Sequence, residues 1–93
     1  MLIYKDNKDA IQIHETKNGN DIEFHIHIFK EEPFVERMKV VREKFDENPA
    51  LTDVFFYVYP NHEYRVIVRQ DYYNDFVLEL MRHQFLLSVE WTA

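Results

Sequence analysis

Apolar and polar residues alternate from Ile22 to Phe29, which places four apolar side chains on one side of an extended chain. This period of two predicts a half-buried β-strand. The segment 10–16 alternates in the same way, and Asn18-Gly19 lies between the two segments. Because both residues of an Asn-Gly pair tolerate positive φ, such a pair is typical of a tight turn. The pattern therefore predicts a β-hairpin of 10–16 with 22–29.

The turn also predicts the register of this hairpin. With Asn18 and Gly19 as the turn residues, apolar residues oppose apolar residues on one face, and polar residues oppose polar residues on the other. A slip of one residue would mix the two sets. The expected pairs are Lys17 with Asn20, Ile13 with Phe24, Ile11 with Ile26, His14 with Glu23 and Gln12 with His25.

Two segments have the period of an amphipathic helix. The first begins at Glu31-Glu32-Pro33, where acids and proline suit a helix start, and it is expected to end at Asn48-Pro49. The second is expected over 72–84, with Asp71 as its N-cap. The inward stripes are Phe34, Met38, Val41 and Phe45 in the first helix, and Tyr73, Phe76, Val77 and Leu80, with Met81 at the margin, in the second.

Strands are also expected over 53–59, 64–69 and 86–92, because these segments are rich in β-branched and aromatic residues. From residue 22 onward the order is β-α-β-β-α-β. This order predicts an α+β fold with a ferredoxin-like core, in which one mostly antiparallel sheet has both helices on one face. We expect a single α+β domain over 1–93, with an N-terminal strand and hairpin arm over 1–21 and the core over 22–93.

The hairpin and the ferredoxin-like strand order make different demands on the strand 22–29. The ferredoxin-like order places 64–69 and 86–92 on its two sides, whereas the hairpin places 10–16 beside it. Both arrangements cannot hold along its full length. The hairpin has the better-defined register, so either 86–92 moves to another edge or the two partners share the strand.

The expected sheet leaves one face without a helix on it. If Phe24, Phe56 and Val66 face the helices, the residues of the opposite parity face away, with His14 and Glu23 among them. Exposed apolar surface of this kind usually marks an interface, and Tyr, Phe and Arg are enriched in interface centres. The expected partner-binding residues are His25, His27, Phe29, Phe55, Tyr57, Tyr59, Arg65, Ile67 and Arg69.

This face predicts a small, non-catalytic protein–protein interaction module that forms a homodimer or binds another protein. The first alternative is a single-stranded nucleic-acid-binding domain that stacks bases on the same aromatic residues. The net charge of −6 argues against nucleic acid, and no aromatic-glycine motif of RNA-recognition domains is present. The second alternative is a divalent-metal site at His14, His25 and His27, although His-x-His is common in strands facing solvent.

The composition narrows the class of protein further. The 93 residues are 46% hydrophobic and 16% aromatic, which suits the dense core of a small domain. There is no cysteine, and no apolar run is long enough to span a bilayer, so a cytoplasmic protein without a membrane partner is expected. No phosphate-binding loop or nucleophile motif is present, and neither catalysis nor a cofactor is expected.

Overall fold

The computed structural model describes residues 2–46 and 54–91 of the chain. The described part contains six strands, two α-helices and two 3₁₀ turns, and all the paired strands are antiparallel. In chain order these elements are β1 (Leu2–Asp6), β2 (Ile11–Asn18), β3 (Asp21–Ile28), α1 (Glu31–Asp46), β4 (Val54–Tyr59), η1 (Pro60–His62), β5 (Glu63–Arg69), η2 (Gln70–Tyr72), α2 (Tyr73–Arg82) and β6 (Leu86–Trp91).

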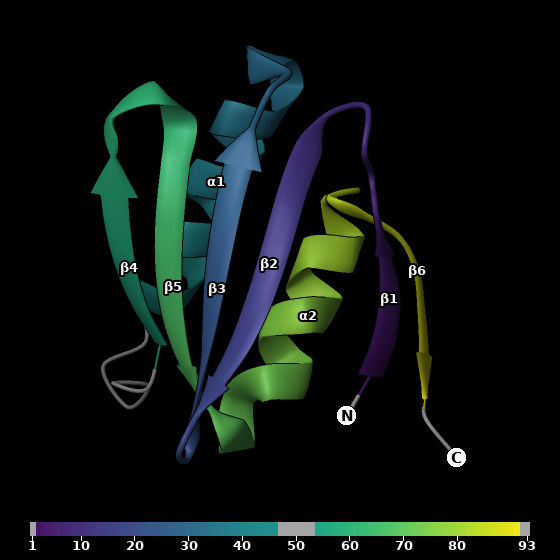
Figure 1. The fold of residues 1–93 in the computed structure, drawn as a ribbon. Helices are drawn as coiled ribbons and strands as arrows, with labels where there is room; N and C mark the ends of the chain where they lie inside the picture. The colour runs from purple at the N-terminus through teal and green to yellow at the C-terminus, as the bar shows by residue number, and fades with distance from the viewer. Residues whose placement is uncertain (1, 47–53, 92–93) are drawn as a thin grey trace.

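The strands form two sheets rather than the single sheet expected from the sequence. Four strands form the larger sheet in the order β2-β3-β5-β4, while β1 and β6 form a separate two-stranded sheet. Both helices pack on the same face of the larger sheet, and the β1–β6 pair lies beside α2 (Figure 1). The α+β class and the helices on one face agree with the prediction, but the strand order is not that of a ferredoxin-like core.

The position of β6 explains this difference. The tight turn keeps β2 beside β3 along eight paired residues, from Ile11 opposite Ile28 to Asn18 opposite Asp21. The edge of β3 that faces away from β5 is therefore fully occupied. In a ferredoxin-like sheet β6 would take that edge, but here it pairs with β1 instead. The local hairpin thus displaces the strand that is most distant in sequence.

The hairpin is confirmed, but its predicted register is wrong by two residues. Asn18 pairs with Asp21, so the turn consists of Gly19 and Asn20. Gly19 has a φ of 63° whereas Asn20 does not have a positive φ, which is the pattern of a type II′ turn with glycine at its first central position. Since a shift of two residues preserves the alternation of faces, the apolar set still faces inward.

The core lies between the inward face of the larger sheet and the two helices. Phe24 is completely buried, and its ring lies 4.9 Å from that of Phe76 on α2. Phe45 on α1 contacts both Phe76 and Phe56, at ring distances of 5.9 and 6.4 Å. These aromatic contacts join both helices to the sheet. The N-terminal strands also contribute Leu2, Ala10 and Ile11 to the same buried cluster.

The helices follow the expected stripes with two corrections. Asp71 is not the N-cap of α2, because it lies within η2 and Tyr72, whose side chain makes no capping hydrogen bond, precedes the helix. The backbone of η2 runs directly into α2, and the N–H of Tyr73 bonds to the carbonyl of Gln70. Met81 is partly exposed rather than buried. The expected helix end at Asn48-Pro49 lies outside the described residues.

The C-terminal strand departs from its predicted pattern at a register shift. Leu86 is buried and Leu87 is exposed, because the pairing of β1 with β6 is irregular where Asp6 meets Leu86. At the edge of the larger sheet, Val58 is also exposed, although its parity places it on the helix-facing side. Among the described residues, no helix is long and apolar enough to cross a membrane.

Candidate protein-binding face

The sheet surface opposite the helices, here called the open face, carries side chains in rows that run across all four strands. Because every pair of neighbouring strands is in register, each residue of a row lies directly opposite the next. Three complete rows are present: Gln12, His27, Glu63 and Tyr59; His14, His25, Arg65 and Tyr57; and Thr16, Glu23, Ile67 and Phe55.

All the strand residues predicted for partner binding lie on this open face. Phe29 follows the end of β3, and its ring contacts His27 at 4.6 Å, so it extends the same surface. Arg69 lies opposite Asp21 at the other end. The predicted partner-binding residues did not include Gln12, Thr16, Asp21 or Glu63, which lie on the same face. Gln12 and Thr16 have the outward parity of the predicted strand 10–16, whereas Asp21 and Glu63 lie just outside the predicted strands 22–29 and 64–69.

The aromatic column consists of Phe55, Tyr57 and Tyr59, which follow one another along β4 on the open face. Each of the three is between 44 and 48% exposed. The guanidinium carbon of Arg65 lies 5.7 Å from the centre of the Tyr57 ring, within the range of a cation–π contact. Ile67 lies directly opposite Phe55 and is partly exposed. Together these side chains form a continuous aromatic and aliphatic strip along one side of the sheet.

Arg65 and Glu23 form the main polar contact of the open face. Arg65 Nε donates a hydrogen bond to Glu23 Oε1 on the neighbouring strand. This bond lowers the pKa of the Glu23 carboxyl below its ordinary value, although partial burial acts in the opposite direction. His25 Nε2 lies 3.6 Å from the other oxygen of the same carboxylate. Glu23 therefore remains ionised near neutral pH and balances the positive charge of Arg65.

The three histidines surround a shallow concavity of about 340 Å³ between β2 and β5. His14 lies directly opposite His25, not opposite Glu23 as the predicted register required. The third histidine, His27, lines the concavity together with Glu63. Among the described residues, however, no group of three or more His, Cys, Asp or Glu side chains is arranged to hold a metal ion. The concavity therefore gives the metal alternative no geometric support.

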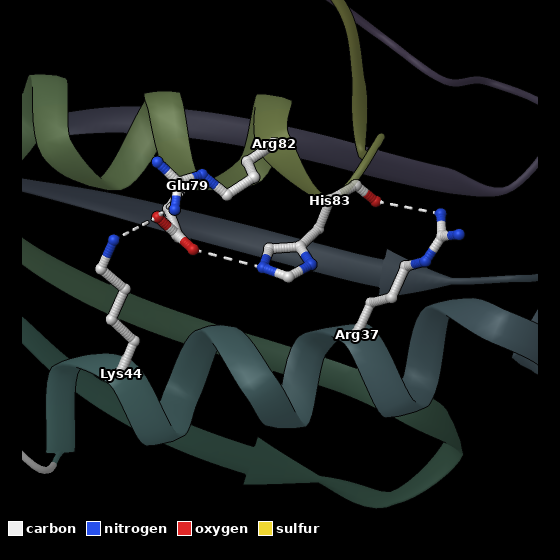
Figure 2. A network of polar contacts seen from close by, with 5 residues as sticks. All are labelled: Arg37, Lys44, Glu79, Arg82 and His83. Carbon is white, nitrogen blue, oxygen red and sulfur yellow. Dashed lines mark hydrogen bonds and ion pairs between the residues drawn. The ribbon is translucent and has the colours of Figure 1, made fainter.

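A second polar cluster, which was not predicted from the sequence, joins the two helices away from the open face. Glu79 on α2 is almost completely buried, with a side chain that is 6% exposed. Its Oε2 accepts a hydrogen bond of 2.6 Å from Lys44 Nζ, and its Oε1 lies 3.2 Å from His83 Nε2 (Figure 2). Arg37 on α1 donates to the backbone carbonyl of His83 at 3.3 Å. The one sequence pattern that could have indicated this cluster is the spacing of four residues between Glu79 on α2 and His83, the C-cap of that helix.

This cluster compensates the buried charge of Glu79, and it does not make the carboxyl a reactive group. Burial alone would raise the pKa of Glu79, but the hydrogen bond and charge of Lys44 outweigh burial and lower it, with smaller contributions from Arg82 and His83. The carboxylate is therefore ionised and matched by cations at neutral pH. Its contacts hold α1 against α2 beneath the sheet.

A third polar group lies where β1, β2 and α2 meet. Glu15 occupies an inward position on β2, opposite Phe24, and interacts with the hydroxyls of Tyr4 and Tyr73. Burial raises the pKa of its carboxyl, and the two hydroxyls act in the opposite direction. Nevertheless, neither Glu15 Oε1 nor the Tyr73 hydroxyl has a hydrogen-bond partner of good geometry among the described residues. The ionised form of Glu15 is thus poorly compensated.

Comparison with known proteins gives no further guide to this surface. No family model, no curated protein and no solved structure matches the chain.

Proposed function

We propose that the protein is a small, non-catalytic interaction module that associates with a second copy of itself through the open face. The observation that carries this proposal is the aromatic column of β4 with Ile67 beside it. Large apolar side chains that remain about half exposed and contiguous are typical of a surface that is covered in an assembly. Tyr, Phe and Arg are also the residue types that contribute most at interface centres.

The distribution of charge favours this surface for association between identical chains. The chain carries a formal net charge of −6, so two copies repel each other over most of their surface. On the open face, the carboxylates of Asp21, Glu23 and Glu63 are opposed by the guanidinium groups of Arg65 and Arg69. The face is therefore close to neutral, and the approach of a second copy is least opposed there.

The same balance argues against the nucleic-acid alternative. Binding to a phosphate backbone draws most of its affinity from an excess of Lys and Arg over acidic residues. The open face has no such excess, and it carries no lysine on the rows that cross its centre. Stacking on the aromatic column would have to act without that electrostatic attraction.

Sedimentation velocity and light scattering from low to high micromolar concentration test the proposal. The wild-type protein is expected to change from monomer to dimer over this range. Tyr57→Asp places a charge in the middle of the aromatic column and is expected to leave a folded monomer. Val40→Asp on α1 is the matched control, since Val40 is 49% exposed but lies away from the open face, and it is expected to dimerise like the wild type. A wild-type monomer at every concentration would falsify the proposal.

A further inference from the structure

None of the described strands lies beside the outer edge of β4. The strand order β2-β3-β5-β4 makes β4 an edge strand, and none of the described strands pairs with its outer side. In an antiparallel sheet, every second residue of an edge strand directs its N–H and C=O groups outward. Such a row of backbone donors and acceptors is complementary to another strand edge.

The residues of β4 themselves carry none of the sequence features that usually prevent strands from pairing. Its six residues, VFFYVY, include no charged residue, no proline and no glycine. Its pairing with β5 runs from Val54 to Tyr59 without a register shift, so the strand is not bulged. Charged side chains, proline and bulges are the common means of protecting an edge.

The other edge strands of the described chain are protected. At the opposite edge of the larger sheet, β2 carries Glu15 and Lys17, and β1 packs nearby. In the smaller sheet, β1 carries Lys5 and Asp6, β6 contains Glu90, and the pairing of the two strands is irregular near Leu86. Among the described strands, the unprotected edge is therefore confined to β4, and its neutrality avoids repulsion between two acidic chains.

We infer that the second copy docks by pairing its β4 antiparallel with β4 across a two-fold axis, so that the two four-stranded sheets continue into one. This inference rests on the proposed self-association and revises its contact surface. The two copies meet only at the β4 border of the open face, where their aromatic columns lie next to each other, and the rest of that face stays exposed. An antiparallel edge is its own complement about a two-fold axis. Because β4 is the only described strand with an unprotected edge, one pairing event uses up that edge, and the assembly closes as a dimer instead of growing into a fibre.

In the paired dimer, the side chains of β4 keep their alternation between the open face and the helix-facing side. When Tyr57 or Phe56 opposes its own copy, Phe55, Tyr57 and Tyr59 of both chains remain on the open face. The two aromatic columns then lie side by side, where cross-strand aromatic pairs add to the stability of the sheet. The open faces of the two copies also merge into one surface of twice the width.

Val58 provides the observation that distinguishes this geometry from face-to-face packing. Its parity places it on the helix-facing side of β4, yet it is 51% exposed. It borders a shallow depression of about 200 Å³ that Val35 and Lys39 of α1 also line. In the edge-paired dimer, Val58 lies opposite Phe56 or Val54 of the second copy and is covered. Face-to-face packing of the open faces leaves Val58 exposed, because it points to the other side of the sheet.

Two substitutions separate these geometries when dimerisation is measured by sedimentation equilibrium. Val58→Lys places a charge on the edge but outside the open face, and it is expected to raise the dimer dissociation constant at least about tenfold. Val40→Lys makes the same chemical change at a nearly equal exposure on α1 and is expected to dimerise normally. Ile67→Asp alters the open face on β5, one strand in from the β4 edge, and its dimer is expected to persist.

The opposite pattern would overturn edge pairing. If Ile67→Asp is monomeric while Val58→Lys still dimerises, the copies pack face to face, and the proposed self-association survives without this geometry. If the wild type is monomeric throughout, both ideas fail. Circular dichroism of each variant establishes that it is folded.

Hydrogen exchange of the wild-type protein provides a test that needs no substitution. As concentration rises and dimer forms, alternate amides of β4 are expected to exchange more slowly, because outward N–H groups become bonded to the second copy. If the dimer forms and the β4 amides gain no protection, edge pairing is ruled out. This test also decides the geometry if Val58→Lys and Ile67→Asp are both monomeric.

Discussion

Lys44 Nζ donates a hydrogen bond of 2.6 Å to Glu79 Oε2, and this contact joins the last turn of α1 to a carboxylate buried on α2. The lysine is half exposed whereas the carboxylate is nearly inaccessible to water. The cation therefore reaches inward from the surface to compensate a charge that the core would otherwise exclude. Because the two helices lie on either side of this contact, it holds them together as well as neutralising Glu79 (Figure 2).

Substituting Lys44→Met is expected to destabilise the protein at neutral pH. The methionine retains the aliphatic stem but leaves the Glu79 carboxylate without its strongest partner. A buried charged group that loses a hydrogen bond costs about 1–3 kcal/mol, and the lower part of this range applies because Arg82 and His83 remain close. Urea denaturation measures the free energy of unfolding. Lys39→Met, at an exposed site on the same helix, is expected to change it by less than about 0.5 kcal/mol.

The lowered pKa of Glu79 predicts a loss of stability in acid. A carboxyl with a lower pKa in the folded state binds fewer protons when folded, so its contribution is fully present above the ordinary pKa near 4.5. The contribution is lost as the pH falls through the lower folded value. Glu79→Gln removes this titration, so its free energy of unfolding is expected to fall less steeply below about pH 4.5 than that of the wild type. Parallel acid slopes for the two proteins would contradict this assignment.

Glu15 is expected to show the opposite dependence on pH. Burial raises the pKa of its carboxyl, so the folded state binds the proton more tightly than the unfolded state does. Its contribution is greatest below the ordinary pKa near 4.5 and decreases as the pH rises through the higher folded value. Glu15→Gln is therefore expected to raise the melting temperature at neutral pH, with a smaller gain in acid. Glu36→Gln, at an exposed site on α1, serves as the control and is expected to change little. A lower melting temperature for Glu15→Gln at neutral pH would show that the ionised carboxylate is well compensated.

The hairpin turn predicts a cost for any side chain at Gly19. Its φ of 63° lies in the left-handed region that residues with a Cβ rarely adopt, although a Cβ built there meets no atom within 4 Å. Gly19→Ala is therefore expected to cost about 1–2 kcal/mol from backbone strain alone. Asn20→Ala is the matched control in the same turn, since Asn20 has no positive φ, and it is expected to cost much less. Equal losses for the two variants in thermal denaturation would argue against a backbone origin.

The alternation of the sequence determined which side of each strand faces the core. Phe24, Val66 and the helical residue Phe76 are buried as predicted, because a period of two or 3.6 directs side chains without reference to distant parts of the chain. For the same reason the members of the open face, including Tyr57 and Arg65, could be named from parity. A register error of two residues in the hairpin left these assignments intact.

Only the tertiary structure decided which residues became neighbours. The displacement of β6 from the larger sheet follows from competition for one edge of β3, which the local hairpin occupies completely. Lys44 and Glu79 are 35 positions apart in sequence, and their contact depends on the packing of α1 against α2. Periodicity reports the direction in which a side chain points, and it carries no information on which distant segment meets that side chain. The faces of this protein were therefore determined by sequence pattern, whereas its strand order, its buried ion pair and the exposed edge of β4 were decided by the competition among segments for partners.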